Sequence, residues 1–220
     1  MGFMKKDVKY IVKQVASEKF FRYEYRKITT DEIARAAGIS KRTLYEHFKN
    51  KEEIVKSIIM DEINRVRNYV ESVLADTKST KLDKIIKLFS ITNDNLTLYN
   101  QELIFKLAVE VPEAFEIIRD YKDTFSEKIL GIFIESQKSG YFRNDVDIVY
   151  ILKIGILFRE LINLESFKNE ETFSRIQICN TFNKLFIQGI LSKKVLMRKD
   201  KKIESLLENI GNEKIKKINI

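Results

Sequence analysis

The sequence predicts an all-α protein, and three observations support this prediction. Apolar residues recur at helical spacing from end to end of the 220 residues, and no stretch alternates with a period of two for long. Glycine and proline are scarce, with seven and one, which excludes collagen-like and loop-dominated folds. The single cysteine, Cys179, excludes a disulfide framework and fits a small buried side chain.

Four helices are predicted in the N-terminal third of the chain. The first covers about residues 6–23, the second 29–38 and the third 40–49. The fourth opens at residue 50 and is long, because its apolar residues form one continuous stripe: Val55, Ile59, Ile63, Val66, Val70 and Val73.

Five more helices are predicted beyond a polar break at residues 76–80. They cover about 81–99, 101–110, 112–138, 145–164 and 170–194. Pro112 is tolerated in the first turn of a helix, and Gly140 ends that helix because glycine adopts the left-handed conformation without steric cost. In the Lys-rich tail, 198–220, a short helix over 203–210 and a frayed end are equally consistent with the sequence.

Positive charge is concentrated at the two ends of the chain. The net charge is +8, made up of +5 over residues 1–53, −2 over 54–192 and +5 over 193–220. A basic N-terminal module on a near-neutral body is typical of proteins that bind the phosphate backbone of nucleic acids. Taken alone, however, the charge is better explained by a solvated, Lys-rich surface.

The segment from residue 29 to residue 48 has the spacing of a helix-turn-helix. Thr29 and Glu32 form a capping box, in which each side chain bonds the other residue's backbone amide. Ala34 lets two helices cross closely, Gly38 permits the positive φ of a tight turn, and Leu44 anchors the second helix.

The second helix of this motif begins with a cap and a basic first turn. Ser40 is the predicted N-cap, and Lys41, Arg42 and Thr43 follow it. In helix-turn-helix proteins the first-turn residues of the second helix contact base edges in the major groove. An ordinary helical hairpin would not place a cap at both helix starts together with these basic residues.

Residues 33–54 (IARAAGISKRTLYEHFKNKEEI) closely resemble the signature of the TetR family of transcriptional regulators. The resemblance covers residues 5–60, and residues 140–147 look like the loop before the dimerisation helices of that family. Two positions depart from the pattern. Glu24 stands where the family commonly has glycine, and Arg42 replaces a small residue or proline.

The resemblance implies an architecture and a function. A three-helix DNA-binding domain, residues 1–53 with its motif at about 29–48, would be joined by the long fourth helix to a helical ligand-binding and dimerisation domain, 54–197, and then to the tail, 198–220. The protein would be a sequence-specific transcriptional regulator, a repressor released from a palindromic double-stranded DNA operator by a small-molecule effector. No cofactor is expected.

The resemblance also implies which residues contact DNA. Thr29 and Ser40 lie at helix N-termini, which attract phosphate through free amides and the helix dipole. Tyr45 and His47 would donate hydrogen bonds to the DNA backbone, Lys51 would pair with a phosphate, and the basic first turn would face bases or phosphates. The full set is Thr29, Thr30, Ser40, Lys41, Arg42, Thr43, Tyr45, His47 and Lys51.

His47 is the only histidine of the chain. A metal site is not expected there, because no Cys, His or carboxylate lies nearby at metal-ligand spacing. A surface histidine that covers Phe48 is the alternative to a DNA contact.

Residues 145–164 and 170–194 are the predicted homodimer interface. The first of these helices is apolar nearly all round, so it must be buried on all sides, and a four-helix bundle between two subunits would bury it. The centre of a monomeric bundle is the alternative.

Four residues are candidates for contact with the effector: Phe89, Phe105, Phe133 and Arg159. Aromatic side chains at helical spacing belong more often to a core than to a pocket. Arg159 lies within an apolar face, where it could clamp a ligand carboxylate or phosphate. An internal pair with a glutamate is favoured, because a buried arginine usually has an acidic partner.

An enzyme is not expected, because the sequence holds no G-x-G-x-x-G, P-loop, G-x-S-x-G or H-E-x-x-H motif. A helical protein-interaction adaptor without a DNA role is the alternative, but it leaves the pattern over residues 29–51 unexplained. No segment has the length and apolarity of a signal peptide or a membrane span, so a cytoplasmic protein is expected.

Overall fold

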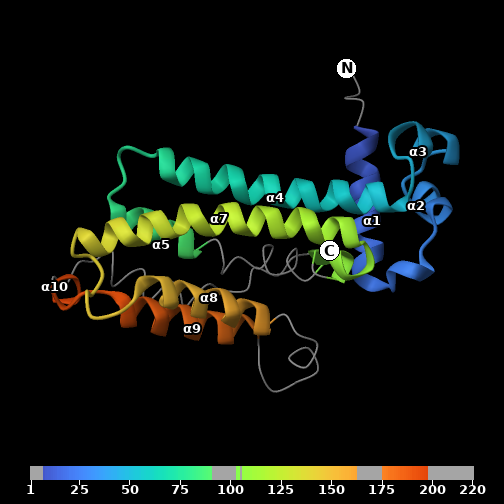
Figure 1. Ribbon diagram of the computed structural model, residues 1–220. Coiled ribbons are helices and arrows are strands. Elements are labelled where there is room, and N and C mark those ends of the chain that lie inside the picture. Colours follow the sequence, from blue (N-terminus) through green and yellow to red (C-terminus); the bar gives the residue numbers. More distant parts are fainter. Residues whose placement is uncertain (1–6, 91–102, 105, 163–174, 198–220) are drawn as a thin grey trace. The chain divides into compact units, whose positions relative to one another are not determined.

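The computed structural model describes residues 7–90, 103–104, 106–162 and 175–197, and these are built from helices (Figure 1). Within these ranges the one β-type pairing is an isolated antiparallel bridge between Phe142 and Leu191. The predicted all-α fold is therefore confirmed. The predicted helix at 203–210 lies outside the described residues.

The chain divides into two compact units. Unit 1 comprises residues 1–68 with 100–123, and unit 2 comprises residues 69–99 with 124–220. Two long helices, α4 (Lys51–Ala75) and α7 (Pro112–Lys138), contribute to both units. The boundary predicted at residue 53 separates a DNA-binding from a ligand-binding function, whereas these units are defined by packing. That boundary therefore stays a prediction.

Unit 1 contains the predicted N-terminal helices. They are α1 (Val8–Arg22), the 3-10 turn η1 (Tyr25–Lys27), α2 (Thr30–Ala36), α3 (Lys41–His47) and the first part of α4. Residues 103–104 and 106–110 are also helical, and the first part of α7 completes the unit. Its core contains the side chains Val12, Ala16, Phe20, Ile33, Leu44, Ile59, Leu107 and Ala114.

Unit 2 is built from α5 (Lys81–Ser90), the second part of α7, α8 (Ile148–Ile162), α9 (Arg175–Ile190) and the short α10 (Lys193–Leu196). The rings of Phe133 and Phe142 lie 5.1 Å apart in its core, beside Ile187 and Ile190. The rings of Phe158 and Phe182 stack with centroids 3.6 Å apart, so α8 and α9 lie side by side.

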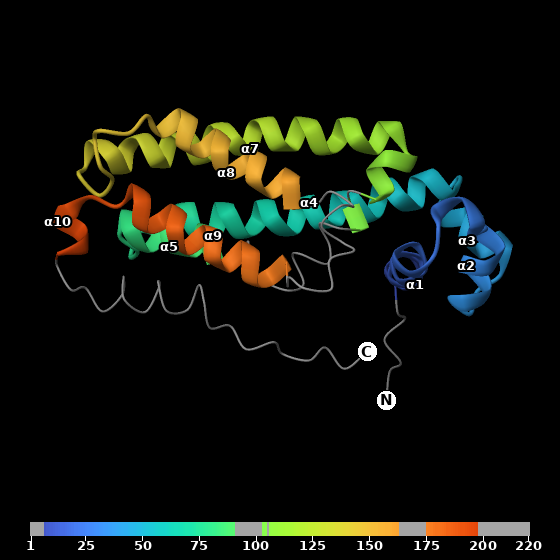
Figure 2. The same ribbon diagram turned by 90° about the horizontal axis from the view of Figure 1, so that it is seen from below.

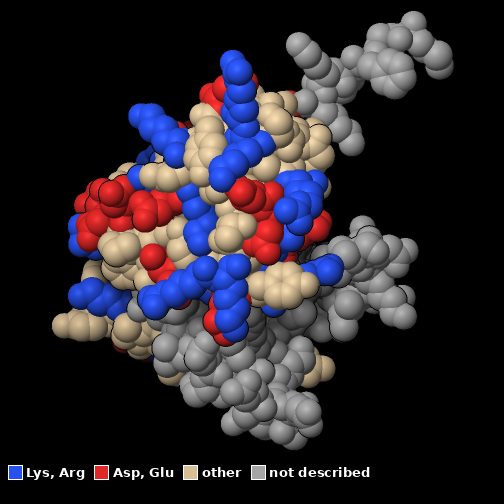
Figure 3. All heavy atoms as spheres, turned by 90° about the vertical axis from the view of Figure 1, so that its right-hand side faces the viewer, with Lys and Arg blue, Asp and Glu red and all other residues tan. Residues whose placement is uncertain are grey.

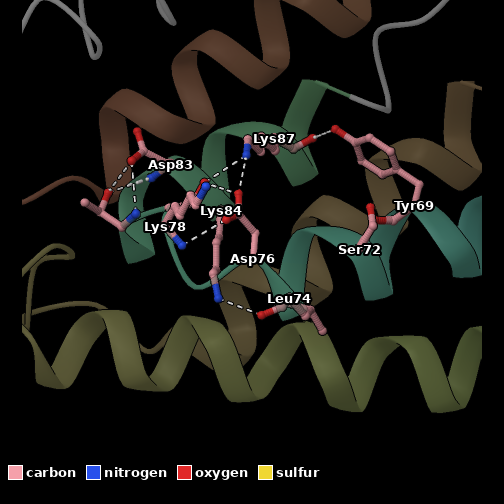
Figure 4. Close-up of polar contacts among 10 residues, drawn as sticks. Tyr69, Ser72, Leu74, Asp76, Lys78, Asp83, Lys84 and Lys87 are labelled. Carbon is pink, nitrogen blue, oxygen red and sulfur yellow. Dashed lines mark hydrogen bonds and ion pairs between the residues drawn. The ribbon is translucent and has the colours of Figure 1, made fainter.

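The polar break between α4 and α5 is a tightly bonded turn (Figure 4). The Asp76 carboxylate accepts hydrogen bonds from Ser79 Oγ at 2.6 Å, Lys87 Nζ at 2.9 Å and the Lys78 amide at 2.9 Å. These bonds, with the Ser79 hydroxyl as the largest cause, hold the pKa of Asp76 well below its usual range. The break therefore fixes the start of α5 and is not a loose linker.

Two predicted helix ends differ in the structure, for local reasons. α8 begins at residue 148, because the Asp147 carboxylate accepts from the Val149 amide at 2.9 Å and caps the helix there. α9 ends at residue 190, because the next residue, Leu191, leaves the helix to pair with Phe142.

Candidate DNA-binding site and effector cavity

Both helices of the motif begin with a side-chain cap. The Glu32 amide donates to Thr29 Oγ1 at 3.2 Å, while the Thr29 amide donates to Glu32 Oε2 at 2.8 Å, which completes the predicted capping box. These bonds from Thr29 lower the pKa of Glu32. At α3 the Thr43 amide donates to Ser40 Oγ at 3.0 Å. The turn between the helices passes through Gly38 at φ +68°, as its position predicted.

Two contacts tie α2 to α3 on the exposed side of the motif. The hydroxyls of Thr30 and Tyr45 lie 3.0 Å apart, and Lys41 Nζ lies 2.8 Å from the Asp31 carboxylate. The hydrogen bond to Asp31 raises the pKa of Lys41. Because each contact joins the two helices, the candidate DNA-contact residues Thr30, Lys41 and Tyr45 are held in one rigid group.

The side chain of Arg42 is almost fully exposed on α3. It is 91% exposed and lies 3.3 Å from Glu46 of the same helix. His47 is half-buried in the last turn of α3, while Phe48 behind it is buried. Figure 3, drawn from the side of Figure 1 on which α2 and α3 lie, shows Lys and Arg interleaved with Asp and Glu.

Lys51 has internal partners that the sequence did not reveal. Its Nζ donates to the backbone oxygens of Tyr25 at 2.9 Å and Ile28 at 2.8 Å, and lies 3.9 Å from the centroid of the Tyr25 ring. Burial lowers the pKa of Lys51, against the opposing effect of Glu110 and other acids. Its predicted phosphate contact stays a prediction, and at most one of its three N–H groups remains for it.

A second lysine bonds the same stretch of backbone. Lys106 Nζ donates to the backbone oxygens of Phe21 at 3.3 Å and Tyr23 at 3.2 Å, and Arg26 Nε lies 3.0 Å from the Glu110 carboxylate. Sequence reasoning missed Lys106 because it lies more than 80 positions away from its partners.

Residues 14–58 match the family model of bacterial regulatory proteins of the tetR family. This stretch holds α2, α3 and both caps. The chain is a TetR-family transcriptional regulator. The family resemblance of the sequence is thereby confirmed, together with its function as a DNA-binding transcriptional regulator.

Relatives and solved structures agree with this assignment. The chain is 28% identical over 142 residues to the transcriptional repressor KstR2 of Rhodococcus jostii, covering 61% of this chain and 67% of the relative. It is 24% identical over 177 residues to the fatty acid metabolism regulator protein of Bacillus subtilis, covering 77% and 88%. The crystal structure of the regulator FadR from Bacillus subtilis with stearoyl-CoA matches with a TM-score of 0.60 at 20% identity, covering 82% of this chain and 98% of that one.

Unit 2 of this TetR-family regulator contains a cavity of about 290 Å³. Its lining residues come from α5, α7, α8 and α9, and Figure 2 shows where these helices run. Most of its lining is apolar, and the polar side chains are Ser126, Glu127, Lys153 and Asn183. The full lining is Leu88, Phe125, Ser126, Glu127, Ile129, Leu130, Phe133, Val149, Leu152, Lys153, Gly155, Ile156, Phe182, Asn183 and Phe186.

Of the four candidate effector residues, Phe133 lines this cavity, and it also belongs to the core of unit 2. Phe105 lies outside the described residues, as do the side chains of Phe89 and Arg159. The choice between a ligand clamp and an internal pair for Arg159 therefore stays open.

Helix α8 of the TetR-family regulator also has an exposed apolar face. Tyr150, Ile154, Leu157 and Leu161 are 47–65% exposed and recur at helical spacing. On α9, Leu185 is 65% exposed. Both helices lie in the segments predicted to form the dimer interface.

Two further observations concern other kinds of site. In the described ranges no group of three His, Cys, Asp or Glu side chains is placed to hold a metal ion. None of the helices in those ranges is both long and apolar enough to cross a membrane.

Proposed function

We propose that the protein is a homodimeric repressor that binds a palindromic operator through α2 and α3, and that leaves the operator when an apolar effector enters the unit 2 cavity. The capped helix pair with its exposed basic first turn is the observation that carries the DNA-binding part. Such a pair presents its second helix to the major groove and its helix N-termini to phosphates.

We assign different tasks to eight of the nine predicted contact residues, all except Lys51. Arg42 is the strongest candidate for reading a base, because its side chain is almost fully exposed and Arg bonds guanine with two donors. Lys41 can exchange Asp31 for a DNA group at little cost, because ion pairs between exposed side chains are weak. Thr29 and Ser40 place the N-termini of α2 and α3 against phosphates. Hydrogen bonds to the DNA backbone come from Thr30, Thr43, Tyr45 and His47.

The exposed apolar face of α8 supports a second copy of this chain as its partner. A surface stripe of large apolar side chains is costly in water, and a two-fold axis lets one stripe cover its own copy. Dimerisation also meets the requirement of specificity, since α3 has only seven residues and reads only a few base pairs. Two copies of α3, about one DNA turn apart, define a site long enough to be singled out.

The cavity lining supports an effector with an apolar chain. Aromatic and aliphatic side chains make up most of its wall, and burying apolar area there stabilises a complex by about 25 cal/mol per Å². The relative from Bacillus subtilis is a fatty acid metabolism regulator protein, and a solved FadR holds stearoyl-CoA. We therefore propose a long-chain acyl compound as the effector class.

Selection of DNA from a random duplex library tests the DNA-binding part. The recovered sequences should share two inverted half-sites about one turn apart, and their affinity should fall steeply with salt, because each phosphate contact adds about −0.9 to the slope of log K against log salt. A library that yields no enriched sequence would favour the protein-interaction adaptor.

Release from the selected operator tests the effector class. Stearoyl-CoA should release the protein, whereas coenzyme A alone, the matched control without the acyl chain, should not. Substituting Ser126, which lines the cavity on α7, by Trp should fill the cavity and make the repressor unresponsive while operator affinity is kept. Equal release by coenzyme A and stearoyl-CoA would contradict an apolar effector.

A further inference from the structure

The connection between α1 and α2, residues 21–28, is held by its backbone carbonyls from two distant segments. Lys51, in the first turn of α4, donates to the oxygens of Tyr25 and Ile28 at 2.9 and 2.8 Å. Lys106 donates to the oxygens of Phe21 and Tyr23 at 3.3 and 3.2 Å. All these residues belong to unit 1.

Each lysine meets a need of the backbone. The last carbonyls of a helix have no partner inside the helix, and a cation near them is favoured by the helix dipole. Phe21 lies in the last turn of α1 and Tyr23 is its C-cap, so Lys106 supplies donors at the point where α1 ends. Lys51 donates to the oxygen of Ile28, the residue that follows η1, and adds a second donor to the Tyr25 oxygen, which already accepts the Ile28 amide at 3.2 Å.

The surroundings of Lys51 favour this internal role over a phosphate contact. Its ammonium group lies over the Tyr25 ring, whose residue is only 8% exposed, and two of its three N–H groups are already donated. The ion pair of Arg26 with Glu110 adds a third tie to the same connection from the helix that carries Lys106.

The connection leads directly into the candidate DNA site. Ile28 precedes Thr29, the N-cap of α2, and Thr29 fixes the first turn of that helix through its capping box. We propose that Lys51 and Lys106 are positioning residues for DNA binding, which hold residues 21–28 by their carbonyls and so set the place of the α2 N-terminus. This inference rests on the proposed DNA-binding function and replaces the phosphate role first expected of Lys51.

Lys51→Met and Lys106→Met test the inference, with Lys49→Met as the matched control. Methionine keeps the apolar stem and removes the ammonium group. Lys49 is exposed, and no ion pair of its side chain is found in the described parts of the chain. The probe is a duplex of arbitrary sequence, because phosphate contacts do not depend on sequence.

Both positioning variants should weaken duplex binding several-fold without changing the slope of log K against log salt. In the free protein, both should speed amide hydrogen exchange over residues 23–32 and leave that of α3 unchanged. A phosphate-binding lysine behaves in the opposite way: its loss makes the slope shallower by about 0.9 per subunit and leaves exchange in the free protein unchanged. We expect this behaviour of Lys49→Met if Lys49 contacts phosphate.

Two outcomes would overturn the inference. One is a shallower slope with unchanged exchange for Lys51→Met, which would restore its phosphate role. The other is wild-type affinity for Lys106→Met. If Lys51→Met does not fold, by circular dichroism, Lys106→Met decides alone. Failure of the wild-type protein to bind any duplex would instead refute the proposed function. The exchange measurement would still test whether Lys51 and Lys106 hold residues 21–28.

Discussion

Replacing Leu157 by Glu is expected to separate the subunits of the dimer while each chain stays folded. Leu157 is 62% exposed on α8, so a partner subunit could bury most of its side chain. Fully burying a leucine contributes about 1.5–3 kcal/mol, so this fraction contributes about 1–2 kcal/mol. A two-fold axis doubles the loss to about 2–4 kcal/mol, and the dissociation constant should rise about 30- to 700-fold. Burying two unpaired carboxylates adds to this effect.

Sedimentation measures the dimer, and circular dichroism measures the fold. Leu196→Glu is the matched control, because Leu196 is 43% exposed on α10, outside the predicted interface. Ile187→Glu is a contrast, since Ile187 is 1% exposed in the core of unit 2, and that variant should unfold rather than dissociate. A Leu157→Glu protein that sediments as a wild-type dimer at low micromolar concentration would refute the assigned interface.

Three more predictions concern the motif and the loop before α8. Arg42→Ala should reduce discrimination between the selected operator and arbitrary DNA by about 1–3 kcal/mol in anisotropy titrations, and unchanged discrimination would argue against base reading. Thr29→Ala removes the acceptor for the Glu32 amide and should lower the free energy of unfolding in urea by about 1 kcal/mol, whereas wild-type stability would show that the cap contributes nothing. Arg143 lowers the pKa of Asp145 to about 2, so this carboxylate stabilises the fold above its ordinary pKa of 3.8 and loses that effect as the pH falls through about 2. The melting temperature of Asp145→Asn should therefore lie below that of the wild type at pH 7 and close to it at pH 2. A difference in melting temperature that grows as the pH falls would contradict this reasoning.

The helix-turn-helix could be predicted from the sequence because its determinants are local. The capping box needs only Thr29 and Glu32, three residues apart, and the turn needs a residue such as Gly38 that accepts a positive φ. The N-cap at Ser40 is equally local. Interactions of this range leave a pattern in neighbouring residues, so composition and spacing were enough to find them.

The partners of the cations could not be predicted in the same way. Lys41 pairs with Asp31 and Arg26 with Glu110, and nothing in the neighbouring residues marks either pair. The count of +5 over residues 1–53 therefore did not show which cations are engaged inside the protein. Lys51 is the clearest example, because its place in the family signature indicated phosphate while its nearest acceptors are backbone carbonyls.

The structure assigns the apolar side chains of helix α8 to different faces, which the sequence alone could not do. Apolar residues surround this helix, so periodicity alone could not assign its faces. The structure turns Val149, Leu152 and Ile156 to the cavity, while Ile154 and Leu157 belong to the exposed face. Side chains three or four positions apart share a face, and those two apart do not. Substitutions on the two faces can therefore separate the response to an effector from dimerisation, although both depend on one helix.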